Sequence, residues 1–110
     1  MGKYSLKKAK DDSYFFHLKA GNGQTILSSE MYTTKAAAEN GIESVRTNSA
    51  IAERFEKKES KGGDPYFVLK AGNHQVIGTS EMYSSDAACQ NGIESVMENG
   101  PDSPTDDETD

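Results

Sequence analysis

The sequence predicts an α+β fold in which two tandem βββα repeats share one antiparallel sheet, with two helices packed on it and approximate two-fold symmetry. The main observation is an internal repeat with an offset of 51 residues, because 21 of the 34 positions in Phe15 to Asn48 are identical in Tyr66 to Asn99. Within each copy, apolar residues alternate in three short stretches, as they do in half-buried strands. An alanine-rich stretch with helical spacing follows them.

The repeat also indicates the domain organisation. Its register extends upstream, so the copies run over residues 3–48 and 54–99, with residues 49–53 between them. A unit of this size rarely buries a core of its own, and the link is too short to tether two independent domains. We therefore expect residues 1–100 to form a single domain, a monomer with pseudo-dimeric symmetry.

Three strands are expected in the first copy, over residues 3–9, 14–20 and 24–29. The loop before the third strand decides which face Ile26 takes, because a change of one residue in loop length reverses the faces. A three-residue loop, 21–23, puts Ile26 on the same face as Phe16 and Leu18. We prefer that loop, and we expect the second copy to repeat the arrangement.

A helix is expected over residues 35–46, because Thr33 and Thr34 are good N-cap residues. Ala38, Ile42 and Val45 then form the apolar stripe of a helix that lies on a sheet. The second copy repeats these steps, with Ser84 and Ser85 as caps and a stripe of Cys89, Ile93 and Val96.

One glycine lies inside each predicted helix, at Gly41 and Gly92. Glycine at such a position costs about 1 kcal/mol relative to alanine. A close approach of the sheet or of the other helix would explain both residues, since a side chain would collide there. We assign them a structural role.

The charge is concentrated at the C-terminus. The net charge is −6, but five of the 18 acidic residues lie in residues 101–110, which leaves 13 acidic against 12 basic residues in the body. A near-neutral body argues against nucleic acid or a membrane surface as partner. The tail has two prolines and no large apolar residue, so we expect it to be disordered. It then serves as a solubilising terminus or, alternatively, binds calcium or a basic partner. A single cysteine, and no signal peptide in residues 1–10, favour a cytoplasmic location.

No catalytic constellation is found, and we expect no enzyme activity, no cofactor and no metal. Cys89 aligns with Ala38 on the face assigned to the core, where a free cysteine behaves as a small hydrophobe. Neither histidine, His17 or His74, is kept in the other copy, and no spacing resembles a metal site. The glycine turns lie between strands, whereas a phosphate-binding loop joins a strand to a helix.

Candidate binding residues lie at the corner between the third strand and the helix, where both copies carry Ser-Glu-Met-Tyr. They are Ser29, Glu30 and Tyr32 in the first copy and Ser80, Glu81 and Tyr83 in the second. Further polar residues are kept in both copies, namely Asn22 and Asn73, Gln24 and Gln75, and Asn40 and Asn91. These side chains could form a paired binding site, one per half. Alternatively, the serine and glutamate satisfy backbone groups while the methionine and tyrosine cover the sheet edge.

Two other functions stay open. Phe15 and Lys19 match Tyr66 and Lys70 on the outer sheet face, where aromatic rings beside lysines can stack the bases of single-stranded nucleic acid. Cross-strand packing is the structural explanation of the same rings. An enzyme that uses the two glutamates and tyrosines of the corners as acid–base groups is the third hypothesis.

The quoted motifs resemble those of the YegP-like family, small uncharacterised bacterial proteins built on a domain of unknown function. The shared features are a strand that ends in LKAGN, the SEMY corner and the alanine-rich helix that ends in NGIESV, each present twice. The resemblance implies βββα units that form one sheet with exchanged strands, and it implies no activity and no site residues. The leading hypothesis is therefore a non-enzymatic binding or interaction module.

Overall fold

The computed structural model describes residues 2–109, and each repeat in it contributes three strands and one helix. The first repeat forms β1 (Lys3–Lys8), β2 (Tyr14–Lys19), β3 (Thr25–Ser28) and α1 (Lys35–Asn48). A short 3-10 helix, η1 (Ala52–Arg54), leads into β4 (Phe55–Glu59), β5 (Pro65–Lys70), β6 (Val76–Thr79) and α2 (Asp86–Asn99), and β7 (Thr105–Asp107) follows. The predicted α+β class and the tandem βββα pattern are confirmed.

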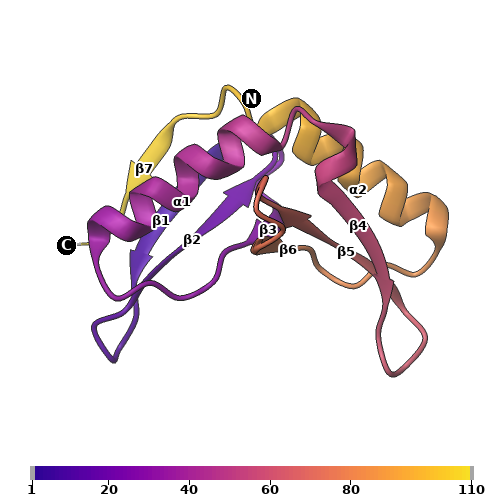
Figure 1. The fold of residues 1–110 in the computed structure, drawn as a ribbon, viewed down its shortest axis with the longest axis horizontal. Helices are drawn as coiled ribbons and strands as arrows, with labels where there is room; N and C mark the ends of the chain where they lie inside the picture. The colour runs from indigo at the N-terminus through magenta and orange to yellow at the C-terminus, as the bar shows by residue number, and fades with distance from the viewer. Residues whose placement is uncertain (1, 110) are drawn as a thin grey trace.

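All the strands belong to one sheet, in the order β4-β5-β6-β3-β2-β1-β7. Strands within each repeat are antiparallel, and the repeats meet where β3 and β6 pair at Ser28 and Thr79. β7 runs parallel to β1, so the sheet is mixed and not wholly antiparallel as predicted. Figure 1 shows the two halves as slopes that meet at β3 and β6, with both helices on the same side of the sheet.

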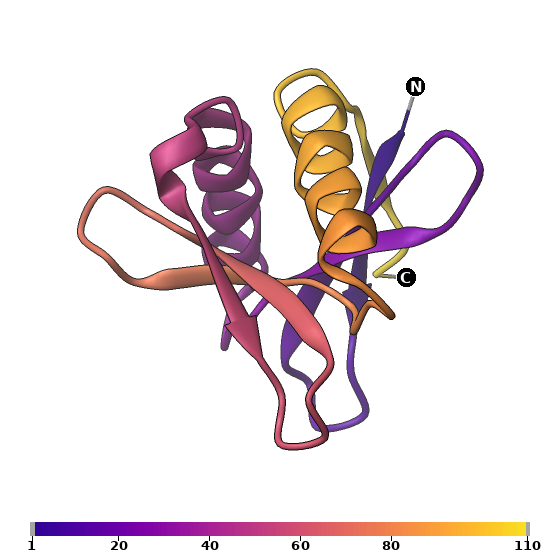
Figure 2. The same cartoon turned by 90° about the vertical axis from the view of Figure 1, so that its right-hand side faces the viewer.

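Each helix begins at the expected cap and then covers strands of both repeats. The Thr34 hydroxyl accepts a hydrogen bond from the Ala37 amide (3.0 Å), and the Ser85 hydroxyl accepts one from the Ala88 amide (3.1 Å). α1 contacts β2 of its own repeat and also β5 and β6, while α2 contacts β5 and also β2 and β3. The helices lie side by side above the sheet (Figure 2), so the halves share helix–sheet contacts.

The buried side chains form one cluster that draws on both repeats. It joins residues from β1, β2, β3 and α1 to residues from β5, β6 and α2, and its largest members are Tyr4, Phe16, Phe67, Leu6, Leu18, Leu27, Ile42 and Leu69. Burial of this apolar surface is the main stabilising contribution to the fold. The predicted division into a single domain of residues 1–100 is consistent with this cluster and stays a prediction until unfolding is measured.

The β2–β3 hairpin has the predicted three-residue loop, closed by a hydrogen bond from the Ala20 amide to the Gln24 carbonyl (2.9 Å). The strand register then shifts, because Leu18 pairs with Leu27 while Lys19 pairs with Thr25. Ile26 is therefore the extra residue of a bulge. Leu27 lies opposite Leu18, and Ile26 is also buried in the core cluster with Phe16 and Leu18, as expected.

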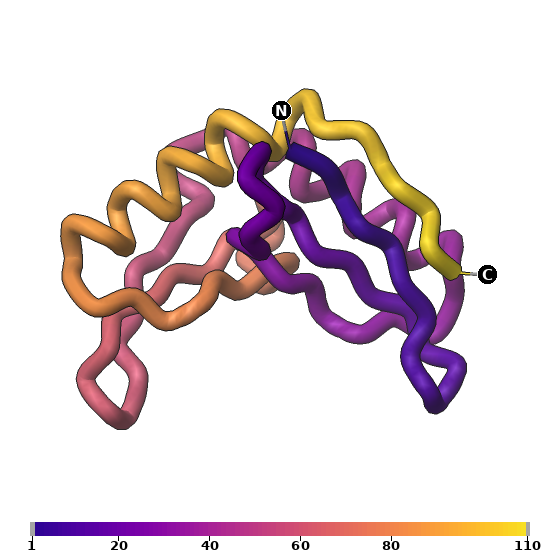
Figure 3. Tube along the Cα trace, turned by 180° about the vertical axis from the view of Figure 1, so that it is seen from behind, coloured from indigo at the N-terminus to yellow at the C-terminus, as the bar shows by residue number. Residues whose placement is uncertain are grey.

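The acidic tail is ordered over its described residues, and the expectation of disorder is wrong there; residue 110 lies outside the described range. Residues 105–107 form β7 beside β1, as the tube in Figure 3 also shows. The tail has almost nothing apolar to bury, which is why composition predicts disorder. Backbone pairing and contacts with basic side chains of the first repeat hold it instead.

Within residues 2–109, neither helix is long and apolar enough to cross a membrane.

Candidate functional site

The two serines of the corners are engaged with the backbone. The Ser29 hydroxyl accepts a hydrogen bond from the Phe16 amide (2.8 Å) and donates one to the Glu30 carbonyl (2.8 Å). Ser80 makes the same two bonds with the second repeat's backbone (2.9 and 2.8 Å). These serines therefore fix the path of the chain from the strand into the corner, as the structural alternative proposed, and their hydroxyls already have partners.

Each corner tyrosine lies flat against a core phenylalanine and covers the helix glycine. The rings of Tyr32 and Phe16 are stacked at 6.3 Å, with 9° between their planes. A β-carbon added at Gly41 would lie 2.5 Å from the Tyr32 hydroxyl oxygen and 3.0 Å from a ring carbon of Phe16. Such distances are too short for an unrelaxed contact, so the glycine leaves room for the tyrosine ring.

The second repeat reproduces this arrangement. Tyr83 and Phe67 are stacked at 6.2 Å with 10° between their planes, and a β-carbon at Gly92 would lie 2.6 Å from the Tyr83 ring. The predicted close approach at both glycines thus involves the corner tyrosine and the sheet, whereas the other helix is not among the nearest atoms.

A groove that we name the Glu81 groove lies between the first repeat's hairpin and the second repeat's corner and helix. Its volume is about 540 Å³. The first repeat contributes Asn22, Gln24, Thr25 and Ile26, and the second contributes Glu81, Met82, Tyr83 and Asn91. Polar residues that the two copies share thus meet across the boundary between the repeats.

A matching groove, the Glu30 groove, lies at the symmetry-related position, with a volume of about 510 Å³. Here the first repeat supplies the corner and helix, through Glu30, Tyr32 and Asn40, and the second supplies the hairpin, through Gln75, Val76 and Ile77. The sequence predicted one site in each half. Four of the six candidate residues instead line two grooves that each need both halves, whereas Ser29 and Ser80 line neither groove.

Some polar side chains of the grooves already have partners within the protein, and others do not. In the hairpin, the Asn22 side chain accepts a hydrogen bond from the Gln24 amide (3.0 Å), and Asn73 and Gln75 repeat it (3.0 Å). No ion pair within residues 2–109 involves Glu30 or Glu81. Each groove therefore holds one carboxylate that forms no ion pair within the described residues, although Glu81 lies close enough to His17 to oppose the lowering of that imidazole's pKa by burial.

The corner tyrosines stay protonated at neutral pH. Burial raises the pKa of both Tyr32 and Tyr83 above the ordinary value of 10.0, and the neighbouring Glu30 raises that of Tyr32 further. Tyr83 is also affected by Cys89 and Glu81, which raise its pKa in the same direction. A phenol of this kind can donate a hydrogen bond but is a poor base.

Each corner carries an exposed methionine, and Met82 lines the Glu81 groove whereas Met31 is not among the residues that line the Glu30 groove. Met31 and Met82 are 55% and 53% exposed, and they are the large hydrophobic side chains that the described chain leaves most open to solvent. The structural alternative assigned them to cover the sheet edge, and for the methionines this stays a prediction. Methionine is flexible and polarisable, so it adapts to apolar parts of a ligand.

The other candidate residues, namely Cys89 and the aromatic and lysine side chains of the outer sheet face, do not lie together in one site. Cys89 is buried, and burial raises the pKa of its thiol, which keeps it unreactive. Phe15 packs edge-on against His17 on the outer face (5.3 Å between ring centres), and Lys70 is paired with Glu56. Within residues 2–109, no group of three or more histidine, cysteine or acidic side chains could hold a metal ion.

Comparison with known families gives two tandem matches to one domain. The family model described as "Domain of unknown function (DUF1508)" matches residues 9–56 and again residues 60–107. A UPF0339 protein of Shewanella oneidensis is 62% identical over 99 residues, which cover 90% of each chain. The UPF0339 protein YegP of Yersinia pestis is 60% identical over 91% of this chain and 89% of its own length.

Solved structures agree with the fold. The solution NMR structure of a UPF0339 protein from Shewanella oneidensis superposes with a TM-score of 0.93 at 58% identity, covering 98% of this chain and 92% of that one. The NMR structure of YegP from E. coli, described as a protein of unknown function, also gives 0.93, at 51% identity over 98% and 93% of the two chains.

Proposed function

The chain belongs to the family of the domain of unknown function DUF1508, in its tandem YegP-like form, and we propose that it is a non-enzymatic binding module with two matching grooves. One observation carries the proposal: the polar residues that both repeats keep are brought together across the repeat boundary. Gln24 faces Glu81 and Tyr83 in one groove, and Gln75 takes the corresponding place in the other.

The chemistry of the grooves favours binding over catalysis. Acid–base work near neutral pH needs a group whose pKa lies close to that pH. The pKa of each corner tyrosine is shifted upward, away from neutrality. The nearby serine hydroxyls hold the backbone, so they are not positioned as nucleophiles. We therefore keep the proposal of a non-enzyme.

The ligand that fits a groove is neutral or cationic and carries hydrogen-bond donors. Glu30 and Glu81 are the only charged residues among those that line the two grooves. An amine, guanidine or amide would pair with the carboxylate, and the flanking methionine would accept an apolar part of the same molecule. Because there are two grooves, the protein binds two such groups, or one partner that presents both.

The experiment is an NMR shift map of the ¹⁵N-labelled protein with fragments of three classes: amines and guanidines, neutral amides, and carboxylates or phosphates. We expect the first two classes to shift amides around Gly41 and Gly92 together. Glu81→Gln should remove the response of its own groove and leave that of the Glu30 groove, while the exposed Glu53→Gln serves as control. Equal binding of anions, or shifts that do not gather in the grooves, would contradict the proposal.

Nucleic acid remains the alternative on the outer sheet face, and we rank it second because Lys70 is already paired with Glu56. A short labelled oligonucleotide, titrated at low and high salt, tests it directly. Micromolar binding that weakens as salt rises, with shifts at Phe15 and Tyr66, would favour the outer face over the grooves. The cytoplasmic location and the monomeric state stay part of the proposal.

A further inference from the structure

The tail adds a strand to the outer edge of the first repeat. Its register pairs Tyr4 with Thr105, Ser5 with Asp106 and Leu6 with Asp107, all in parallel. Hydrogen bonds from the Tyr4 amide to the Pro104 carbonyl and from the Glu108 amide to the Leu6 carbonyl, both 2.8 Å, close the two ends of this pairing. The edge of β1 thus binds an extended backbone.

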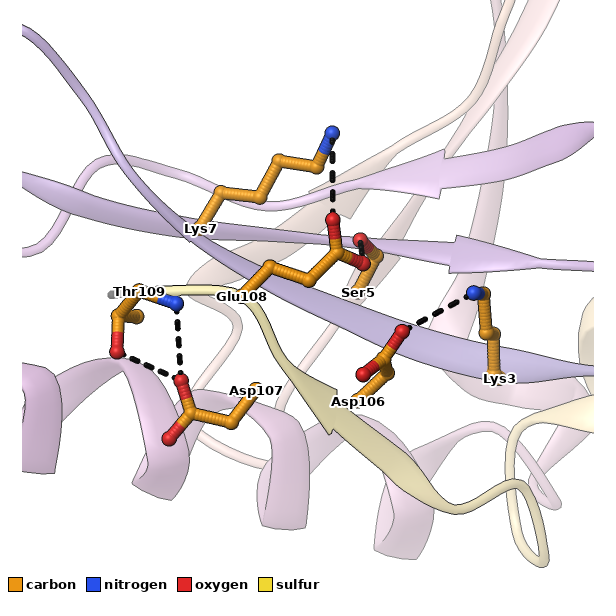
Figure 4. Close-up of polar contacts among 7 residues, drawn as sticks. All are labelled: Lys3, Ser5, Lys7, Asp106, Asp107, Glu108 and Thr109. Carbon is orange, nitrogen blue, oxygen red and sulfur yellow. Dashed lines mark hydrogen bonds and ion pairs between the residues drawn. The ribbon is translucent and has the colours of Figure 1, made fainter.

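Side chains of the first repeat recognise the acidic residues of that strand. The Lys3 ammonium pairs with Asp106 at 3.1 Å, and the Ser5 hydroxyl donates a hydrogen bond to Glu108 at 2.5 Å. Figure 4 shows Asp106 and Glu108 over β1, with Lys7 also reaching Glu108 (3.9 Å). Successive acidic residues therefore meet successive groups of one strand.

The helix supplies the rest of the recognition. Lys35, at the start of α1, pairs with Asp107 at 2.5 Å. Arg46, at its other end, donates hydrogen bonds from Nη2 to the Ser103 carbonyl and to the Thr105 hydroxyl, both at 3.0 Å. The three acidic positions 106–108 each have a basic partner, on alternate sides of the added strand.

The second repeat offers the same edge without the same chemistry. β4 is the counterpart of β1 and pairs only with β5 within the described chain. The positions of Lys3 and Lys7 stay basic in the second repeat, as Arg54 and Lys58, but that of Ser5 is taken by Glu56, that of Lys35 by Asp86 and that of Arg46 by Met97. Two acids would repel an acidic strand and the methionine cannot donate a hydrogen bond, so the first repeat fits such a strand better than the second does.

The ion pairs that hold the tail lie at the surface, where water competes for the same charged groups. The side chains of the pairs Lys3–Asp106 and Lys35–Asp107 are between 41% and 49% exposed, and all three residues of β7 are exposed. Exposed ion pairs contribute little each and weaken as salt rises. These ion pairs therefore hold the tail weakly enough for another segment to displace it.

We propose that the edge of β1, with Lys3, Ser5, Lys7, Lys35 and Arg46, is a docking site for an extended acidic segment of a partner protein. The chain's own tail occupies this site and shows the pattern it accepts: three consecutive acidic residues in a strand parallel to β1. A partner segment binds by taking the place of residues 105–108. Strand addition supplies the affinity through the backbone, and the lysines and arginine supply the selectivity.

The test uses the full chain with its tail charge reversed, Asp106→Lys/Glu108→Lys, and a labelled synthetic peptide with the sequence of residues 101–110. Fluorescence anisotropy measures the binding. We expect the tail-reversed chain to bind the peptide roughly 10- to 100-fold more tightly than the wild type does, because the tethered tail of the wild type competes at an effective concentration on the order of millimolar. Binding should weaken as salt rises.

A matched control carries the second repeat's residues into the same surface. Adding Lys35→Asp and Arg46→Met to the tail-reversed chain should abolish binding, whereas Lys57→Asp on β4 should leave it unchanged. A peptide with lysine at positions 106 and 108 should not bind. Failure of the tail-reversed chain to bind, or equal binding after Lys35→Asp/Arg46→Met, would overturn the proposal.

A measurement on the wild type keeps the test independent of the folding of any variant. In a ¹⁵N spectrum, an excess of the acidic peptide, about ten millimolar, should move the amides of residues 105–108 toward the positions of a free tail. The lysine-substituted peptide should not. A tail that stays in place at that concentration would contradict the proposal.

Discussion

The two repeats are almost the same around the corner tyrosines and different where they meet and where they end. Tyr32 over Gly41 and Tyr83 over Gly92 have the same stacking within 0.1 Å and 1°, measured against their phenylalanines (6.3 and 6.2 Å, 9° and 10°). At the seam between β3 and β6, however, Leu27 in the first repeat corresponds to Gly78 in the second.

The seam shows why the halves are complementary and not interchangeable. A β-carbon at Gly78 would lie 2.6 Å from two side-chain carbons of Leu27, so the leucine fills the space that a second side chain would need. In a strictly symmetric pair the same residue stands on both sides, and two leucines collide while two glycines leave a hole. A single chain with two copies can carry a leucine in one copy and a glycine in the other.

The outer strands of the two repeats, β1 and β4, also differ from each other. β1 is covered by the tail, and its residues from Tyr4 to Leu6 are buried. β4 has no such cover among the described residues, and Glu56, Lys57, Lys58 and Glu59 are all exposed. Charged side chains along an open edge discourage pairing with other strands. Each repeat thus protects its edge, one by covering it and the other by charge.

The largest effect is expected from removing the complementarity at the seam. Leu27→Gly should reduce the free energy of unfolding by about 3–5 kcal/mol, because a fully buried leucine leaves a cavity. Gly78→Leu should cost about 2–3 kcal/mol through collision with Leu27. Denaturant unfolding of the full chain measures both changes.

The exchanged pair makes the test specific. In Leu27→Gly/Gly78→Leu, the leucine stands on the other side of the approximate two-fold axis, where it should fill the same space. We expect the double variant to lose less free energy of unfolding than the two single variants lose together, by at least about 1 kcal/mol. Simple additivity of the two losses would mean that the halves do not complement each other there.

A smaller and equal effect is expected at the two helix glycines. Gly41→Ala and Gly92→Ala each gain helix propensity, but the added methyl group must displace the corner tyrosine. We expect a net loss of about 1–2 kcal/mol in both variants, measured by denaturant unfolding. If both variants are unchanged or more stable, the tyrosine moves away freely and the glycines are not needed for close approach.

The smallest effect concerns the tail and depends on pH. A hydrogen bond from Lys35, helped by Thr109, lowers the pKa of Asp107 to about 2, and one from Lys3 lowers that of Asp106. A carboxyl whose pKa is lowered in the docked state contributes stability above its ordinary pKa of about 4 and loses it as pH falls. The tail should therefore detach between about pH 4 and pH 2.

Amide shifts of residues 105–108, followed from pH 6 to pH 2, measure this detachment. Lys35→Gln removes the main cause of the shift for Asp107, so detachment in that variant should begin at higher pH. A tail that is unaffected at pH 2, or that detaches equally in both proteins, would show that these ion pairs do not hold it.

Local patterns were enough to predict the three strands and the helix of each repeat, but not η1 or β7. Alternation and capping residues placed the strands and helices within about two residues, because those signals lie within one short segment. The bulge at Ile26 was missed, since loop length does not reveal an extra residue inside the strand. As a result, Leu27 was not recognised as a core residue.

Contacts between distant segments were harder to predict. The polar residues that line the grooves were identified because both copies keep them, but their meeting across the repeats depends on the β3–β6 seam. The tail was misjudged because its partners, Lys3, Lys7 and Lys35, lie about 70 to 100 positions earlier. A clue was present in the opposite charges of the N-terminal strand and the tail.

The central claim is that the two repeats form one folding unit whose grooves need both halves. The direct test is equilibrium unfolding of the full chain in denaturant, followed separately at Phe16 and Phe67 by the disappearance of their folded amide signals. The account predicts the same midpoint and the same slope for both residues, because each helix packs on strands of the other repeat. Two separate midpoints would contradict it.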